Sequence, residues 1–182
     1  MAELARRLAA TLHISVRVRV GPQLIKINVN NDVMKVFKTK GGNSVNVVKH
    51  TLAQLKDSPT VTIHIGTDSQ TSGQWTTYST VIAYRFNRNG VHYIFTKQKF
   101  PKIPDLWTRL WKEAEMSIEI AEWLTTQINV NIQIDMDYNG DEDHASHKLI
   151  SAAKGWANSL GYKVNVKPHN QIATRAADHE CR

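Results

Sequence analysis

The sequence predicts an α/β fold with a mixed five-stranded sheet in the order βββαβαβα, flanked by helices and preceded by a basic extension. Two observations carry this prediction: three strand-like segments follow one another after residue 59, and helical and strand-like segments alternate after them. Strands joined by turns pair antiparallel, whereas strands joined through a helix lie parallel. A chain of 182 residues with 41% hydrophobic content buries one core. We therefore expect an extension at 1–58 and one main domain at 59–182.

The extension is predicted to contain a hairpin and a helix. Apolar residues alternate with polar ones over 14–20 and 25–29, on either side of a Gly-Pro turn, so the two runs form a hairpin with a basic outer face. A lysine-rich loop around Gly41 follows. A helix then runs from about residue 43 to Pro59, with a buried stripe formed by Val45, Val48, Leu52 and Leu55.

The main domain is predicted to begin with three antiparallel strands at 61–66, 75–86 and 91–97. The dipeptide Asn89-Gly90 is a strong signal for the second hairpin. Asp105 is a suitable N-cap for a long helix that ends near residue 126. The remaining elements are a strand at 130–137, a helix at about 143–160, a strand at 162–166 and a helix at about 172–180.

Positive charge is concentrated in the first third of the chain. Residues 1–60 hold ten of the 23 Lys and Arg but three of the 16 acids, so the rest of the chain is neutral and the net charge of +7 lies in this part. A basic segment suits a polyanionic partner such as nucleic acid, although a solubilising surface has the same composition. The predicted nucleic-acid contacts are Arg17, Arg19, Lys26, Lys38, Ser69, Gln70, Arg109 and Lys167.

The sequence also predicts a cytoplasmic protein without a membrane partner. No apolar run approaches the roughly 20 residues that span a bilayer, and the first residues lack the apolar core of a secretory signal. These residues weakly resemble an organelle transit peptide, but Glu3 and the scarcity of serine argue against one. Cys181 is the single cysteine, which excludes an internal disulfide and a thiolate zinc cluster.

Acidic residues stand where two strands of the predicted sheet end. Asp68 follows the first strand of the main domain, and Asp135 and Asp137 close the fourth. If these strands are parallel neighbours, their carboxylates project from the same edge, where ligand sites of such sheets form. Asp135 and Asp137 share one strand face, so either or both can contribute.

Two helices supply further candidate acids. Glu113 interrupts the buried stripe of the long helix, and an unpaired buried carboxylate costs several kcal/mol, so a cation must lie nearby. That cation is either a metal ion or Arg109, one turn back. Asp178 follows two alanines, Ala176 and Ala177, that allow the last helix to approach the sheet closely. Alone, Asp178 has the features of a surface acid.

A carboxylate cluster of this kind suits the hydrolysis of phosphodiesters. Two Mg²⁺ or Mn²⁺ ions activate a water, orient the phosphate and neutralise the leaving oxygen, and Mg²⁺ prefers oxygen ligands. In this scheme Asp68 and Asp135 bind both ions, Glu113 holds the water-activating side and Asp178 the other. Without metal, the acids raise one another's pKa values.

Several blocks of the chain, in order, resemble the YkuK-like family of predicted RNase H-like nucleases, whose element order also matches. The resemblance implies an RNase H fold, a nuclease activity on nucleic acid with Mg²⁺ or Mn²⁺, and a site at Asp68, Glu113, Asp135 and Asp178 within the catalytic domain at 59–182. Asp137 stands where the resemblance implies an uncharged residue. The matching blocks are IGTDSQ (65–70), RLWKEAEMSIEIAEWL (109–124), IQIDMDYN (132–139), KGWANSLGY (154–162), KPHNQIA (167–173) and AADH (176–179).

Three other readings compete with a nuclease. The fold can persist in a nucleic-acid-binding or scaffold domain without catalysis. A sugar-kinase or actin-like ATPase shares the GTDS turn but repeats the fold twice, which this length does not allow. His144 and His147 lie near three acids at a helix start, so these residues are a second candidate metal site. Acids in the first turn of a helix, however, also interact favourably with the helix dipole. Trp75 either stacks on a base or packs in the interior.

Overall fold

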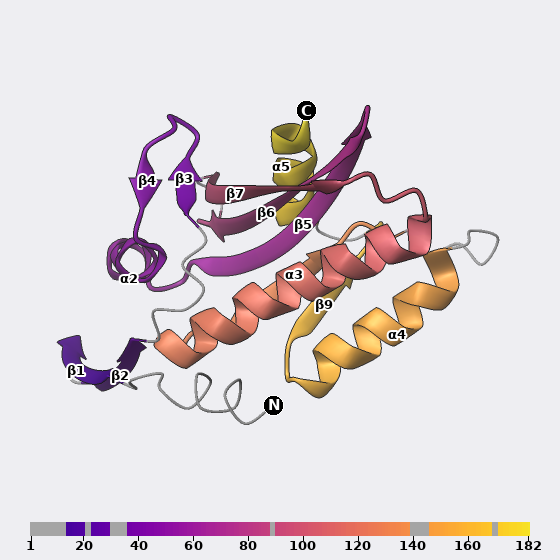
Figure 1. The fold of residues 1–182 in the computed structure, drawn as a ribbon. Coiled ribbons are helices and arrows are strands. Elements are labelled where there is room, and N and C mark those ends of the chain that lie inside the picture. The colour runs from indigo at the N-terminus through magenta and orange to yellow at the C-terminus, as the bar shows by residue number, and fades with distance from the viewer. Residues whose placement is uncertain (1–13, 21–22, 30–35, 88–89, 139–145, 169–170) are drawn as a thin grey trace, which may run out of the picture.

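The computed structural model describes residues 14–20, 23–29, 36–87, 90–138, 146–168 and 171–182, with side chains described from residue 36 onward except at 146–148. Figure 1 shows the helices and strands of these ranges in space. The strands are β1 (Ile14–Val20), β2 (Gln23–Val29), β3 (Phe37–Thr39), β4 (Ser44–Val45), β5 (Thr62–Ser72), β6 (Trp75–Arg85), β7 (Val91–Pro101), β8 (Ile132–Met136) and β9 (Lys163–Val166). The helices are α2 (Val47–Asp57), α3 (Leu106–Gln127), α4 (Ser146–Ser159) and α5 (Ile172–Cys181).

The meander predicted for the main domain is present. β5, β6 and β7 pair antiparallel, and the first turn places Gly73 at φ 58°, a conformation that favours glycine. β5 does not end at residue 66 as predicted, because its polar half from Thr67 to Ser72 stays paired with β6. Asp68 therefore lies inside a strand and not at its end.

The parallel half of the sheet also agrees with the prediction. β8 pairs parallel with β5, and β9 pairs parallel with β8. The helix between β7 and β8 begins where the sequence indicates, because the Asp105 carboxylate accepts a hydrogen bond of 2.7 Å from the backbone N–H of Thr108. The carboxyl ends of β5 and β8 thus point the same way, as the acidic site requires.

The main sheet has seven strands and not five, in the order β4-β3-β7-β6-β5-β8-β9. The two additional strands are β3, in the segment predicted as a lysine-rich loop, and β4, at the start of the predicted helix; they have three and two residues, too few to show an alternating pattern. Val45 belongs to β4 and not to the helix, which starts at Val47 with Asn46 as its N-cap. Since β3 pairs with β7, the sheet includes part of the predicted extension.

The predicted hairpin at the start of the chain is formed by β1 and β2, which pair antiparallel in a sheet of their own. Their side chains lie outside the described residues, so the basic outer face and the roles of Arg17, Arg19 and Lys26 stay predictions. No helix in the described ranges is both long and apolar enough to cross a bilayer.

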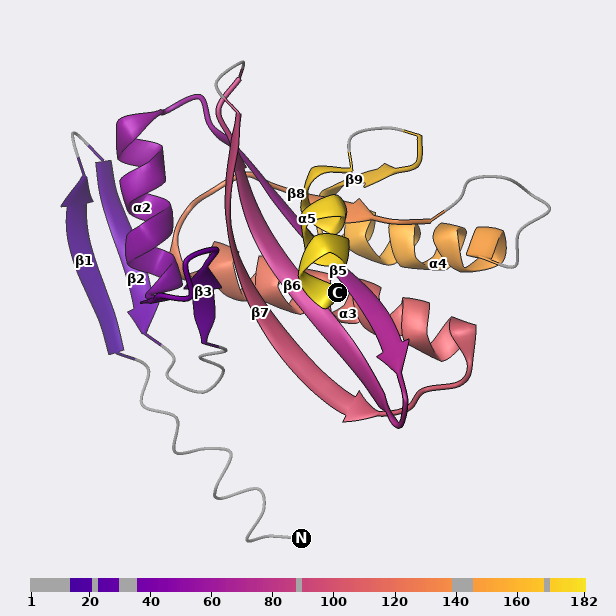
Figure 2. The same cartoon turned by 90° about the horizontal axis from the view of Figure 1, so that it is seen from above.

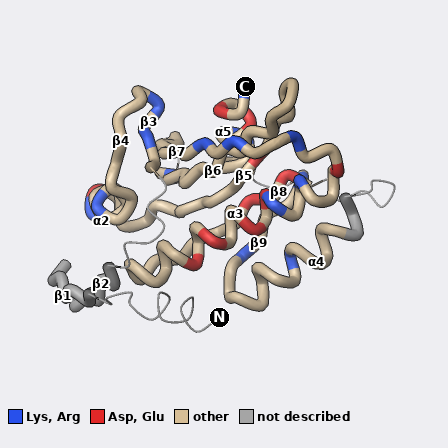
Figure 3. Tube along the Cα trace, viewed as in Figure 1, with Lys and Arg blue, Asp and Glu red and all other residues tan. Residues whose placement is uncertain are grey.

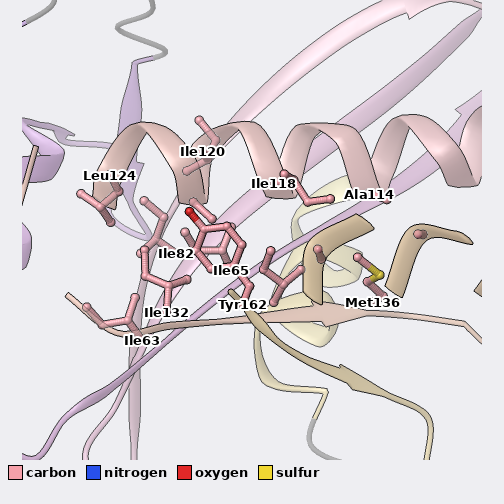
Figure 4. Packing of buried hydrophobic residues seen from close by; sticks show 14 of the residues in the cluster. Ile63, Ile65, Ile82, Ala114, Ile118, Ile120, Leu124, Ile132, Met136 and Tyr162 are labelled. Carbon is pink, nitrogen blue, oxygen red and sulfur yellow. The ribbon is translucent and has the colours of Figure 1, made fainter. Parts of the chain in front are cut away.

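Helices cover both faces of the main sheet, with α3 and α4 on one side and α5 on the other (Figure 2). The larger core lies under α3 and α4, where Ile118 and Leu124 pack against isoleucines of β5, β6 and β8 (Figure 4). The smaller core joins α5 to β6 through Val81, Ala83, Ala173 and Ala177.

Gly66 allows α5 to lie close to β5. A Cβ atom at this position would come within 2.9 Å of Thr174 Cγ2, a distance that real Cβ atoms almost never show, and within 3.0 Å of both Thr174 N and Asp135 O, which are backbone atoms. Ala177 is also buried, and its small side chain lets α5 lie close to the sheet, as the pair Ala176-Ala177 predicts. The start of α5 is therefore held against β5 and β8, beside the predicted acidic edge.

Candidate metal centre

Asp68 is half-buried in β5, on the face that α5 covers. Side chains alternate along β5, so Asp68 shares this face with His64 and Gly66, whereas Ser69 faces α3. Burial is the largest of the effects that raise the pKa of Asp68 to about 6, and the charges of Asp178 and Asp137 raise it further. Asp68 therefore has two acidic neighbours from different elements.

Glu113 approaches from the opposite face of the sheet. It is 5% exposed on α3, and the Ser69 hydroxyl donates a hydrogen bond of 2.6 Å to its Oε1 atom. Burial raises the pKa of Glu113 to about 8, the Ser69 hydrogen bond lowers it, and Asp68 and Asp137 raise it. Burial thus favours the protonated form of the Glu113 carboxyl.

Asp68 and Glu113 lie near the point where the pairing of β5 with β8 ends. The pairing of β5 with β8 stops at Gly66 and Asp135, so the outer half of β5 has no strand on that side within the described residues. The two side chains lie on different faces of β5, and the charge of Asp68 is among the effects that raise the pKa of Glu113. The end of β8 is therefore where these acids come together.

Asp137 follows directly after β8. The parallel pairing of β5 with β8 ends at Gly66 and Asp135, two residues before Asp68 and Asp137. The charge of Asp137 raises the pKa values of both Asp68 and Glu113. Asp137 forms an ion pair of 2.5 Å with Lys167, whose side chain is half exposed.

Asp178 on α5 is the fourth acid of the group. Arg182, one turn later, donates to both carboxylate oxygens of Asp178 at 2.7 and 3.2 Å. This pair lies at the surface, with side chains 46% and 68% exposed, and such pairs contribute little to stability. We call Asp68, Glu113, Asp137 and Asp178 the acidic cluster.

Asp135 has a different environment from the acidic cluster. Its side chain is fully buried, and the Oδ1 atom contacts His64 Nδ1 at 3.1 Å and accepts from Asn165 Nδ2 at 2.8 Å. The Oδ2 atom accepts from the backbone N–H groups of Ile172 and Ala173, both at 2.8 Å. Four partners occupy the lone pairs of this carboxylate, which caps the start of α5.

The position of Asp135 differs from its predicted role. The sequence places Asp135 and Asp137 on one strand face and leaves both as candidates, but the hydrogen bonds of Asp135 turn its carboxylate toward α5. Only Asp137 lies near the other acids closely enough to raise their pKa values. Asp135 and Asp137 differ in where they lie relative to the end of the paired part of β5. That difference can be recognised only once the parallel pairing of β5 with β8 is known.

The chemistry of the acidic cluster fits a divalent cation, because its donors are carboxylate oxygens and two of them carry raised pKa values. Within the ranges that the structure describes, no three His, Cys, Asp or Glu side chains are already arranged as a ligand set. Lys167 and Arg182 occupy two of the carboxylates instead. A bound ion therefore requires these basic side chains to move aside.

Arg109 does not act as the salt-bridge partner of Glu113. Its Nη1 atom donates to Thr71 Oγ1 at 3.4 Å, and no ion pair between Arg109 and Glu113 occurs in the described part of the chain. The guanidinium nonetheless lies close enough to lower the pKa values of Asp68 and Glu113. Arg109 is therefore not the direct ionic partner of the buried Glu113 that one interpretation of the sequence predicts.

The other candidate site residues differ in how exposed the structure shows them to be. Gln70 and Lys38 are exposed, whereas Ser69 is partly buried and bonded to Glu113. Trp75 is 53% exposed at a hairpin turn, so it is not buried in the interior, and its stacking on a base stays a prediction beside half-buried packing. The side chains of His144 and His147 lie outside the described residues.

Comparison with known proteins agrees with this arrangement of strands and helices. Residues 44–182 match the family described as ribonuclease H-like. The chain belongs to the ribonuclease H-like family. No curated protein matches the chain. Membership in the ribonuclease H-like family accounts for the mixed sheet flanked by helices, and the match includes β4 and α2, which the sequence assigns to the extension.

Proposed function

We propose that this protein is a metal-dependent nuclease that hydrolyses phosphodiester bonds of nucleic acid at the acidic cluster. The observation that carries the proposal is that acids from separate segments lie near Asp68: the charges of Asp137 and Asp178 raise the pKa of Asp68, and the charges of Asp68 and Asp137 raise the pKa of Glu113. Like charges gathered in this way destabilise a fold, so their proximity is consistent with a function that needs them. Membership in the ribonuclease H-like family supports the same substrate class.

The residues of the acidic cluster would hold one or two Mg²⁺ or Mn²⁺ ions. Such ions, when bound, polarise the phosphate and lower the pKa of a water molecule. Ser69 orients the Glu113 carboxylate through its hydrogen bond of 2.6 Å. Asp135 contributes indirectly, because it holds the start of α5 and thereby the position of Asp178.

Two basic residues beside the acidic cluster have a second role in this proposal. Lys167 and Arg182 form ion pairs with Asp137 and Asp178. If these carboxylates held a divalent ion instead, both basic side chains would be free to bind a phosphate of the substrate. Arg109 adds a third positive charge near Asp68.

A cleavage assay tests the proposed function. Wild-type protein is incubated with labelled RNA, DNA, RNA/DNA hybrid and branched DNA, in Mg²⁺, in Mn²⁺ and in EDTA. We expect cleavage of at least one substrate with metal, none in EDTA, and none by the Asp68→Asn variant with a retained circular-dichroism spectrum. Binding without cleavage of any substrate would instead identify a scaffold that has kept the fold without the reaction.

A further inference from the structure

The sheet face that carries Asp68 continues past α5 toward β3. The small core under α5 joins it to β6, Tyr93 and Phe95 of β7 pack against that core, and β3 extends the sheet beyond them. Antiparallel pairing sets Lys38 of β3 directly beside Phe95 of β7, and Lys97 and Lys99 follow on the same face. We call these four residues, Lys38, Phe95, Lys97 and Lys99, the β7 lysine strip.

The β7 lysine strip is positively charged and open to solvent. Its three lysines are exposed, and Figure 3 shows their positions as blue segments along β3 and β7. Lys97 forms an ion pair of 3.5 Å with Glu180 of α5, which also accepts a hydrogen bond of 2.9 Å from Tyr93. Lys38 and Lys99 have no acidic partner within 4 Å among the described residues. Their charge is therefore available to an external anion.

A hollow follows the same strip. It measures about 390 Å³ and is lined by Val36, Lys38, Phe95, Thr96, Lys97 and Gln98. The pairing of β3 with β7 includes Phe95 but none of the later residues of β7, so the edge of β7 is open from Lys97 onward in the described chain. The Lys97 ammonium lies 5.4 Å from the centre of the Phe95 ring, which gives the hollow an aromatic wall beside a cation.

The β7 lysine strip leads to the acidic cluster. Asp68, Ser79 and Lys97 are direct cross-strand neighbours on β5, β6 and β7 and share one face. Neighbouring strands lie roughly 4.8 Å apart, so the backbone of Lys97 is roughly 10 Å from that of Asp68. Lys97 and Lys99 are two residues apart, roughly 6.8 Å along the strand, a spacing similar to that of phosphates in an extended nucleic-acid strand.

We infer that the β7 lysine strip binds the sugar-phosphate backbone of a nucleic-acid strand and directs it toward Asp68. The lysines contact successive phosphates, and Phe95 provides an apolar surface for a sugar or base between them. This inference rests on the proposed function for its choice of ligand. It assigns substrate binding to residues of the sheet itself, in addition to the basic hairpin formed by β1 and β2.

Binding measured without metal tests the inference separately from catalysis. Fluorescence anisotropy of labelled RNA, DNA and hybrid oligonucleotides is recorded in EDTA over a series of NaCl concentrations. We expect the Lys38→Ala, Lys97→Ala, Lys99→Ala triple variant to bind at least about tenfold more weakly and to lower the slope of log K against log salt by about 2, since each lost phosphate contact on a single strand removes about 0.7.

A matched control removes the same charge elsewhere. Lys49 and Lys56 on α2 and Lys154 on α4 are exposed on elements that pack against the other core, and their triple alanine variant should bind as wild type does. Equal losses in both triple variants, or no loss in either, would overturn the inference. If wild type cleaves with Mg²⁺ and the strip variant binds normally, the inference fails alone. If the strip variant loses binding but wild type cleaves nothing, the proposed function fails alone.

Discussion

Cleavage by the Asp137→Asn variant is expected to fall about 10³-fold below wild type at saturating Mg²⁺, with little change in stability. The expected loss reflects the several kcal/mol of transition-state stabilisation that a correctly held metal supplies. The fold should tolerate the substitution, because the ion pair with Lys167 is partly exposed and such pairs contribute about 1 kcal/mol or less. Initial rates of cleavage and a thermal melt of the same preparation provide the two measurements.

A Lys167→Ala variant is the control for this substitution. It removes the same ion pair but leaves the Asp137 carboxylate, so the rate at saturating Mg²⁺ should fall far less than in Asp137→Asn. Equal loss of rate in the two variants would mean that the ion pair, and not a metal ligand, is what Asp137 contributes.

Asp135→Ala is expected to lower the free energy of unfolding by about 3–5 kcal/mol, because it removes a buried carboxylate from four partners at once. The two N–H groups at the start of α5 lose their acceptor, and the buried His64 and Asn165 lose theirs. Such a loss is a large part of the 5–15 kcal/mol typical of a domain. Urea unfolding followed by circular dichroism measures it.

Asp137→Asn serves as the reference for this experiment, since it removes a carboxylate two residues away on the same segment. If Asp135→Ala were destabilised by less than about 1 kcal/mol, the capping role of Asp135 would be wrong. A folded Asp135→Ala protein that lost only cleavage would restore the metal-ligand role that the sequence assigns to it.

Most of the sheet could be predicted from the sequence because its signals are local. Turn residues mark both hairpins of the meander, and Asp105 marks the start of α3. β3 and β4 could not be predicted in this way, since among the described strands β4 pairs only with β3, and the pairing of β3 with β7 depends on residues about 55 positions away in the chain. The polar outer half of β5 was missed for a similar reason: its partner strand, and not its hydrophobicity, keeps it extended.

The candidate site likewise contains one residue that the sequence reveals and one choice between residues that it does not. Glu113 stands out in the sequence because a carboxylate interrupts an apolar stripe, and its burial on α3 agrees with that pattern. The choice between Asp135 and Asp137 depends on where α5 begins, because the N–H groups of Ile172 and Ala173 bind one of the two carboxylates. No spacing within the segment around β8 contains that information.

The central claim is that the acidic cluster binds a divalent cation, and titration of the protein with Mn²⁺ by calorimetry tests it most directly. We expect saturable binding that releases protons and strengthens as the pH rises from 6 to 8, because burial raises the pKa of Glu113 to about 8 and its proton must leave before a cation binds. Asp68→Asn should abolish the binding. Absence of saturable binding by wild type, or equal binding by Asp68→Asn, would contradict the claim.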